Sequence, residues 1–124
     1  MKAILFVEDH KLLARMGCEV LERQGYFVVS AGNAEAALAR FGKETFDMVV
    51  TDYLMEGMDG VELARRLRAQ APGLPIIVVS GCAAPEPCDE VSAWVEKENM
   101  FPALLETIRR LLNEPVAGER RRSA

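Results

Sequence analysis

The chain alternates between two kinds of apolar pattern, and this alternation restricts its fold more than any other feature. Short runs rich in Val and Ile predict strands at residues 2–7, 26–31, 47–51 and 75–80, with a weaker run at 92–96. Most of these runs lack polar alternation, which is typical of strands covered on both faces. Apolar residues at helical spacing occupy the intervals between them. We therefore expect helices layered on both faces of a central sheet.

Three of the helical patterns are apolar stripes. They contain Leu12, Leu13, Met16, Val20 and Leu21 in the first, Val61, Ala64 and Leu67 in the second, and Phe101, Leu104, Leu105, Ile108, Leu111 and Leu112 in the third. Asn33 is expected to cap a further helix at Ala34–Phe41. Strands that alternate with helices through short connections favour right-handed βαβ units. The expected fold class is an α/β, (βα)5 doubly wound, five-stranded parallel sheet with helices on both faces.

One helix of this pattern is expected to be short or missing. The sequence GCAAPEPCDEV, residues 81–91, stands between the fourth and fifth predicted strands. Pro85 and Pro87 leave room for about two turns of helix at most. The fourth of the five helices is therefore the one that we expect to be reduced.

Length and charge limit the number of domains and the kind of partner. The 124 residues suit a single domain, expected at residues 1–115, followed by a flexible basic tail at 116–124. The net charge is −4, and without the tail, which holds three arginines and one glutamate, it is −6. Such an acidic domain is a poor binder of nucleic acid, whose phosphates dominate affinity.

The cysteines and the N-terminus indicate the compartment. The three cysteines, Cys18, Cys82 and Cys88, include no CxxC pair, which is typical of a reducing cytosol. The first apolar run is too short for a signal peptide or a membrane span. We therefore expect a cytoplasmic protein with no membrane association.

Polar residues stand where four of the predicted strands end. They are Glu8 and Asp9 after the first strand, Asp52 after the third, Ser80 at the end of the fourth and Lys97 after the last. The carboxyl ends of parallel strands share one edge of the sheet, where ligands of open α/β sheets bind. We expect three carboxylates, a hydroxyl and an ammonium group to meet at this edge.

These groups together suit phosphoryl transfer. Clustered carboxylates repel one another unless a cation is present, and oxygen ligands with phosphate nearby favour Mg²⁺. Asp52 would then act as the nucleophile and form an aspartyl phosphate. The metal would lie on Glu8 and Asp9. Lys97 and Ser80 would contact the phosphoryl oxygens.

Each of these residues, taken alone, also has a purely structural interpretation. Acids suit the start of a helix, Asp and Ser often form turns, and exposed lysines are common. His10 follows the acidic pair and is expected at the surface of the first helical turn. Only the combination of strand ends favours a site.

Four features in combination resemble the receiver domain of two-component response regulators. They are VEDH at 7–10, TDYLMEGMDG at 51–60, VVSG at 78–81 and the lysine at 97, and the likeness covers roughly residues 2–113. The resemblance implies a (βα)5 fold that accepts a phosphoryl group on an aspartate. The donor would be a sensor histidine kinase or a histidine phosphotransfer protein, and the cofactor would be Mg²⁺.

The resemblance also assigns roles by position. The phosphoryl chemistry would use Asp52 as phosphoacceptor with Ser80 and Lys97. The metal ligands would be Glu8, Asp9, Asp52 and the backbone carbonyl of Leu54. The switch residues would be Ser80 and Trp94. Trp94 stands three residues before the lysine, at the aromatic switch position where the family usually has Tyr or Phe, and the other positions lie in the motifs given above.

The chain departs from the family pattern at three places. Glu56 stands where the family usually has proline, and Glu98 replaces the proline that usually follows the lysine. The segment between Ser80 and Lys97 is also shorter than usual. In the family this region belongs to the signalling face, so the resemblance implies an altered output surface.

The leading interpretation is a stand-alone receiver in a phosphorelay. It would signal through protein–protein contacts to an unknown downstream protein, without a DNA-binding domain, and homodimerisation stays open. It would not be an enzyme, apart from self-dephosphorylation. The alternative is a degenerate receiver that acts only as a protein-binding module. An aspartate-nucleophile phosphatase would need an acid two residues after Asp52, and Leu54 stands there.

Overall fold

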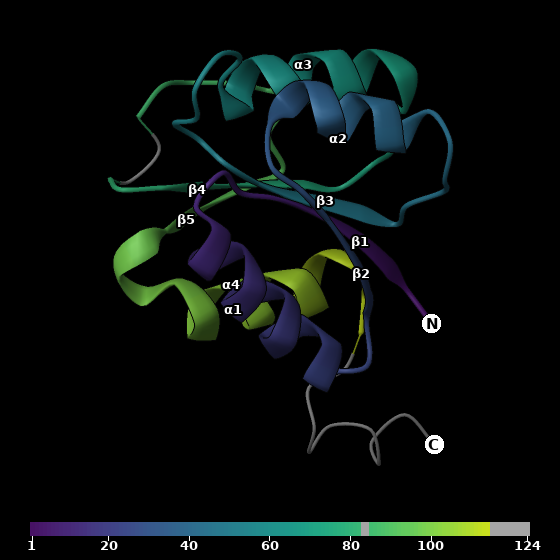
Figure 1. Cartoon of the computed structure of the whole chain (residues 1–124), viewed down its shortest axis with the longest axis vertical. Coiled ribbons are helices and arrows are strands. Elements are labelled where there is room, and N and C mark those ends of the chain that lie inside the picture. The colour runs from purple at the N-terminus through teal and green to yellow at the C-terminus, as the bar shows by residue number, and fades with distance from the viewer. Residues whose placement is uncertain (83–84, 115–124) are drawn as a thin grey trace.

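The predicted strands form one parallel sheet at the centre of the molecule (Figure 1). The computed structural model describes residues 1–82 and 85–114, so the predicted basic tail at 116–124 lies outside the described residues. Within them the strands are β1 (Ala3–Val7), β2 (Phe27–Ala31), β3 (Met48–Asp52), β4 (Ile76–Ser80) and β5 (Ala93–Glu96). Their order is β2-β1-β3-β4-β5, and every neighbouring pair is parallel. The predicted sheet is confirmed.

Helices cover both faces of this sheet, as predicted. Helices α1 (Lys11–Arg23) and α4 (Met100–Leu111) lie on one face, and α2 (Ala34–Phe41) and α3 (Gly60–Gln70) lie on the other (Figure 1). A short 3₁₀-helix at Lys97–Asn99 precedes α4. Within the described residues, none of the helices has both the length and the apolar character that a membrane span requires.

The apolar core has two halves because successive side chains of a strand point to opposite faces. Leu5 and Val49 belong to the half beneath α2 and α3. Phe6 and Val50 belong to the half beneath α1 and α4. All five residues of β3 are buried, Asp52 included. The double coverage explains why the central strands show no polar alternation.

Polar side chains cap the helices that begin near the site. Asn33 accepts a hydrogen bond from the Ala36 N–H at 2.7 Å, which confirms the predicted cap of α2. His10 caps α1 by accepting from the Leu13 N–H at 3.3 Å, a surface role that fits its predicted exposed position. Glu8 and Asp9 therefore precede the cap of α1 and do not form it.

The predicted apolar stripe of α1 is partly wrong. Leu12 and Met16 are 57% and 41% exposed, whereas Gly17 and Leu21 are buried. Gly17 lies so close to the ring of Phe6 that a Cβ at this position would overlap it. The helix approaches the sheet through its glycine, so Leu12 and Met16 turn toward solvent.

The connection from β4 to β5 contains no helix in its described part, 81–82 and 85–92, as the two prolines predicted. Arg68 of α3 holds its far end. The guanidinium donates to the Glu90 carbonyl at 2.8 Å and to the Pro72 carbonyl at 2.9 Å. The label α4 in Figure 1 therefore marks the helix after β5, and not the helix that was expected to be reduced.

Candidate functional site

Three carboxylates meet where β1 and β3 end. The two strands are neighbours, with Val7 beside Thr51, so the residues that follow them lie at the same edge. Glu8, Asp9 and Asp52 each offer an oxygen within 4.8 Å of the others. Asp52 and Glu8 are each 5% exposed, whereas Asp9 is exposed. The structure thus brings together the three predicted acids.

The surroundings make negative charge costly at this cluster. Burial raises the pKa of Asp52 above its ordinary value, against the lowering by the Lys97 ammonium, and the charge of Asp9 raises it further. Burial likewise raises the pKa of Glu8, against the hydrogen bond from the His10 N–H, and the charge of Asp52 adds to the rise. A cation bound between these groups would remove the penalty.

The donor set fits Mg²⁺. Its three side chains offer only carboxylate oxygens, which suit a hard ion, and Mg²⁺ commonly binds one or two carboxylates while keeping several waters. Leu54 lies two residues beyond the end of β3, and its side chain is 72% exposed. Its carbonyl as a further ligand stays a prediction.

The lysine predicted for the site reaches Asp52. Its Nζ lies 3.1 Å from Asp52 Oδ2, and its side chain is 39% exposed. Residue Lys97 follows directly on β5, whose last residue, Glu96, pairs with Ser80 of β4. The described residues contain no cis peptide bond, so Glu98 after the lysine is compatible with this contact.

The Ser80 hydroxyl is buried at the same edge, but its hydrogen bonds run to the β4–β5 connection. Its Oγ accepts a hydrogen bond from the Cys82 N–H at 3.1 Å and lies 3.8 Å from Cys82 Sγ. On the sheet, Val79 is the register partner of Asp52, so Ser80 stands one residue beyond it. The structure places Ser80 near the acids without a contact to them.

Trp94 belongs to a pair of aromatic residues beside the site. It is partly buried on β5, and its ring meets that of Tyr53 edge to face, with centroids 5.6 Å apart and planes at 75°. The Tyr53 hydroxyl donates a 2.6 Å hydrogen bond to Glu86 of the β4–β5 connection. Sequence reasoning missed Tyr53 and Glu86; the one available signal was the position of Tyr53 directly after Asp52.

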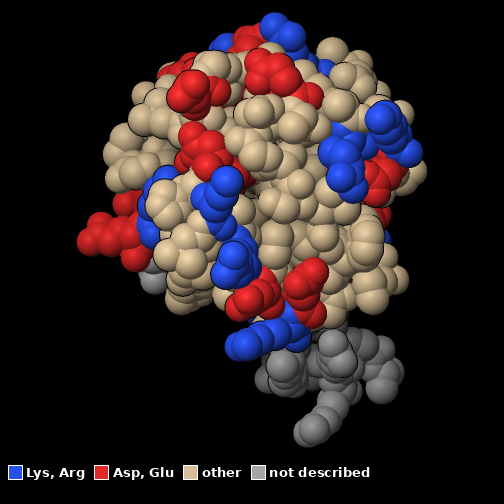
Figure 2. Space-filling model, viewed as in Figure 1, with Lys and Arg blue, Asp and Glu red and all other residues tan. Residues whose placement is uncertain are grey.

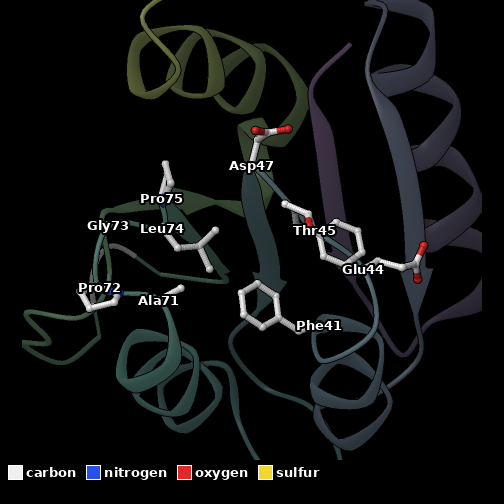
Figure 3. A pocket seen from close by; sticks show the side chains of 10 residues that line it. Phe41, Glu44, Thr45, Asp47, Ala71, Pro72, Gly73, Leu74 and Pro75 are labelled. Carbon is white, nitrogen blue, oxygen red and sulfur yellow. The ribbon is translucent and has the colours of Figure 1, made fainter.

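A cavity of about 550 Å³ lies away from the acids, at the amino ends of β3 and β4 (Figure 3). Strand β3 is five residues long, which places its two ends about 13 Å apart. Its lining is mixed, with Phe41 and Leu74 beside Glu44 and Asp47. Both acids are already engaged, Glu44 by Arg40 at 2.6 Å and Asp47 by the Ala3 N–H at 2.7 Å. The cavity therefore lies at the opposite end of the sheet from the cluster of Glu8, Asp9 and Asp52.

Comparisons with known proteins show the family to which the chain is related. The family described as response regulator receiver domain matches residues 4–97. The response regulator receiver protein CpdR of Brucella abortus is 40% identical over 84 residues, which is 68% of this chain and 70% of CpdR. The virulence sensor protein BvgS of Bordetella pertussis is 36% identical over 122 residues, covering 92% of this chain but only 10% of BvgS.

Solved structures of lower sequence identity show the same fold. The response regulator TrrA from Thermotoga maritima, solved in complex with Mg²⁺-BeF, superimposes with a TM-score of 0.83 at 29% identity, over 90% of this chain and 99% of TrrA. The chemotaxis protein CheY4 of Vibrio cholerae also gives 0.83 at 29% identity, over 90% of this chain and 98% of CheY4. The chain belongs to the response regulator receiver domain family.

Proposed function

We propose that this domain is a phosphorylatable switch in which Asp52 is the phosphoacceptor. Receiver domains of two-component systems are phosphorylated by histidine kinases and are signalling modules. The observation that carries the proposal is the contact of Lys97 Nζ with Asp52 Oδ2 at 3.1 Å, beside the carboxylates of Glu8 and Asp9. The proposed nucleophile thus stands beside a lysine and two acids that could hold a metal ion.

In the proposed reaction, a carboxylate oxygen of Asp52 attacks the phosphorus of a phosphohistidine. A P–O bond forms, the P–N bond breaks, and the imidazole leaves and takes up a proton. Lys97 is close enough to Asp52 to pair with a phosphoryl oxygen once that oxygen is bound. Held by Glu8, Asp9 and Asp52, Mg²⁺ would offset the negative charge of the transferred group. Hydrolysis of the acyl phosphate by water would reset the switch.

The proposed partners follow from the family and the charge. The histidine kinase ThkA has been solved in complex with TrrA, which superimposes on this chain with a TM-score of 0.81 at 30% identity. A histidine kinase or phosphotransfer protein is therefore the donor that we propose. Acidic and basic side chains are intermixed on the face shown in Figure 2, which suits protein contacts better than nucleic acid. The three free cysteines suit the reducing cytoplasm as its location.

Output would begin at Ser80 and Trp94. We propose that the Ser80 hydroxyl turns from Cys82 to a phosphoryl oxygen and that Trp94 moves inward, which changes the surface around β5. This is a two-state change driven by local electrostatics. The alternative, a degenerate receiver that only binds proteins, gives no reason for Lys97 to lie against a buried carboxylate.

Labelling with a small acyl phosphate tests the proposal. Acetyl phosphate with Mg²⁺ should add one phosphoryl group to the wild-type chain, seen by intact mass, and none to Asp52→Asn. Asp89→Asn is the matched control, because Asp89 is an exposed acid on the β4–β5 connection. Equal labelling of wild type and Asp52→Asn would contradict the assignment. A folded wild-type protein that takes no label would favour the binding-module alternative.

A further inference from the structure

The β4–β5 connection is fastened at its middle to the residue that follows Asp52. Tyr53 Oη donates a 2.6 Å hydrogen bond to Glu86 Oε2, and we call this bond the latch. Glu86 Oε1 also lies 3.8 Å from a guanidinium nitrogen of Arg65 on α3. Because Arg65 is about half exposed, the ion pair adds little, whereas a short hydrogen bond to a carboxylate is a stronger contact.

Tyr53 cannot follow the connection if it moves, because its backbone is fixed. Its N–H donates to the Val79 carbonyl at 2.8 Å, and its carbonyl accepts from the Gly60 N–H at 2.7 Å. A movement of Tyr53 would therefore be limited to rotation of its side chain. The ring of Tyr53 therefore stands between Glu86 on one side and the edge-to-face contact with Trp94 on the other.

The two ends of the connection differ in what holds them. At its start, the Cys82 N–H donates to Ser80 Oγ. This is the hydroxyl that would turn to a phosphoryl oxygen in the proposed function. At its end, Arg68 donates to the Glu90 carbonyl and the Ile76 N–H donates to Ser92 Oγ at 2.9 Å. The end is thus independent of Asp52, whereas the start is released when Ser80 turns.

We propose that the Tyr53–Glu86 latch couples Asp52 to the β4–β5 connection, and this inference rests on the proposed function. The latch holds the Tyr53 ring in place, and that ring holds Trp94 in its partly buried position. Inward movement of Trp94 displaces the ring and breaks the latch, just as Ser80 releases Cys82. Residues 85–90 of the connection then change the surface that they present, while Arg68 still holds the Glu90 carbonyl. Tyr53 is a positioning residue that stabilises the unphosphorylated state.

The latch should affect the equilibrium between the unphosphorylated and the activated conformation. An interaction present only in the unphosphorylated state opposes activation, and its removal shifts the population toward the activated state. Loss of one hydrogen bond to a partly exposed carboxylate should make the activated state about fivefold easier to reach. The chain has one tryptophan, so its fluorescence reports Trp94 alone.

The test titrates beryllofluoride, a phosphoryl mimic, at saturating Mg²⁺ while Trp94 fluorescence is recorded. Tyr53→Phe and Glu86→Ala should each lower the half-saturating concentration about fivefold. The double variant should show no further shift, because both changes remove the same bond. Amide hydrogen exchange at residues 85–92 should also accelerate in Tyr53→Phe before the mimic is added.

The chain offers a matched control in its other tyrosine. Tyr26 donates a hydrogen bond of the same length, 2.6 Å, to Glu114 beyond α4. Tyr26→Phe should leave the half-saturating concentration unchanged. Equal half-saturating concentrations in wild type and Tyr53→Phe would overturn the latch, as would additive shifts in the double variant. If Asp52 is labelled by acetyl phosphate in the same preparations, either result overturns the latch alone; if it is not labelled, the proposed function fails as well.

Discussion

Two connections leave the carboxyl edge of the sheet beside the site, and they are held in different ways. The connection from β3 to α3 is fixed by its backbone through Tyr53, whose N–H and carbonyl both bond to main-chain groups. The connection from β4 to β5 is held mostly by side chains, among them those of Tyr53, Arg65 and Arg68, and its backbone bonds to the sheet only where Ser92 donates to the Ile76 carbonyl, within the described residues. Backbone hydrogen bonds suit the β3–α3 connection, because the position of Asp52 at its start has to stay constant. Side-chain contacts suit the β4–β5 connection, because they can break and re-form when it changes conformation.

The sharpest test of this difference is Gly60→Ala, for which we expect the largest effect. A Cβ on Gly60 would overlap the carbonyl of Asp52, a backbone group that cannot move aside. We expect a loss of about 3 kcal/mol in the free energy of unfolding, or about 10 °C in melting temperature. Labelling of Asp52 should fall with it, because the helix start and the strand end can no longer meet.

Gly73 provides the control for that substitution. A Cβ at Gly73 would meet nothing within 4 Å, and the residue needs no left-handed backbone conformation. Gly73→Ala should therefore change the melting temperature little. If Gly60→Ala melts like wild type, the β3–α3 connection can shift as easily as the other one, and the contrast between the two connections is lost.

The next effect concerns the far end of the β4–β5 connection. Arg68→Ala removes the donor to the carbonyls of Pro72, Leu74 and Glu90, and it should cost about 2 kcal/mol by urea unfolding. Arg66→Ala is the control, because within the described residues the Arg66 side chain pairs with Glu62 alone, on the exposed face of α3. This substitution should cost at most about 0.5 kcal/mol. Equal costs would show that Arg68 does not anchor the connection.

The two connections also differ in how far the sequence could predict them. Asp52 could be predicted as a site residue because topology alone brings the ends of parallel strands to one edge. Lys97 and Ser80 follow from the same rule. The structure places Lys97 against Asp52 and buries Ser80 without a contact to the acids, and the roles of both stay predictions. Position along a strand is a local property, so a single sequence contains it.

The contacts of the β4–β5 connection could not be predicted in this way, because they join residues that are distant in the sequence. Tyr53 and Glu86 are 33 residues apart, and their meeting depends on the path of a segment without regular structure. The two prolines predicted that a helix would be reduced but not where the chain would run instead. The exposure of Leu12 and Met16 was missed for a similar reason, because the close approach at Gly17 depends on Phe6 of another element.

The smallest predicted effect is that of Asp52→Asn, which should stabilise the fold instead of destabilising it. It tests whether the Asp52 side chain helps to hold the β3–α3 connection. Burial raises the pKa of Asp52 in the folded state. At pH values between the ordinary pKa and this raised pKa, the folded chain binds a proton that the unfolded chain does not hold. The free energy of unfolding therefore falls as pH increases through this range. Without Mg²⁺ at neutral pH, Asp52→Asn should therefore raise the free energy of unfolding by about 1 kcal/mol, the size of a like-charge contact, and should flatten the fall with pH.

Mg²⁺ sharpens this last test. It should stabilise the wild-type chain, whose buried carboxylates it would neutralise on binding, and should stabilise Asp52→Asn less. Lys97 has solvent access through its partly exposed side chain, so loss of its partner leaves no buried cation to offset the gain. A destabilised Asp52→Asn in thermal melts without Mg²⁺ would mean that side-chain contacts of Asp52 fasten the β3–α3 connection. The two connections would then be held by the same kind of contact, and the backbone alone would not explain how Asp52 keeps its position through a phosphorylation cycle.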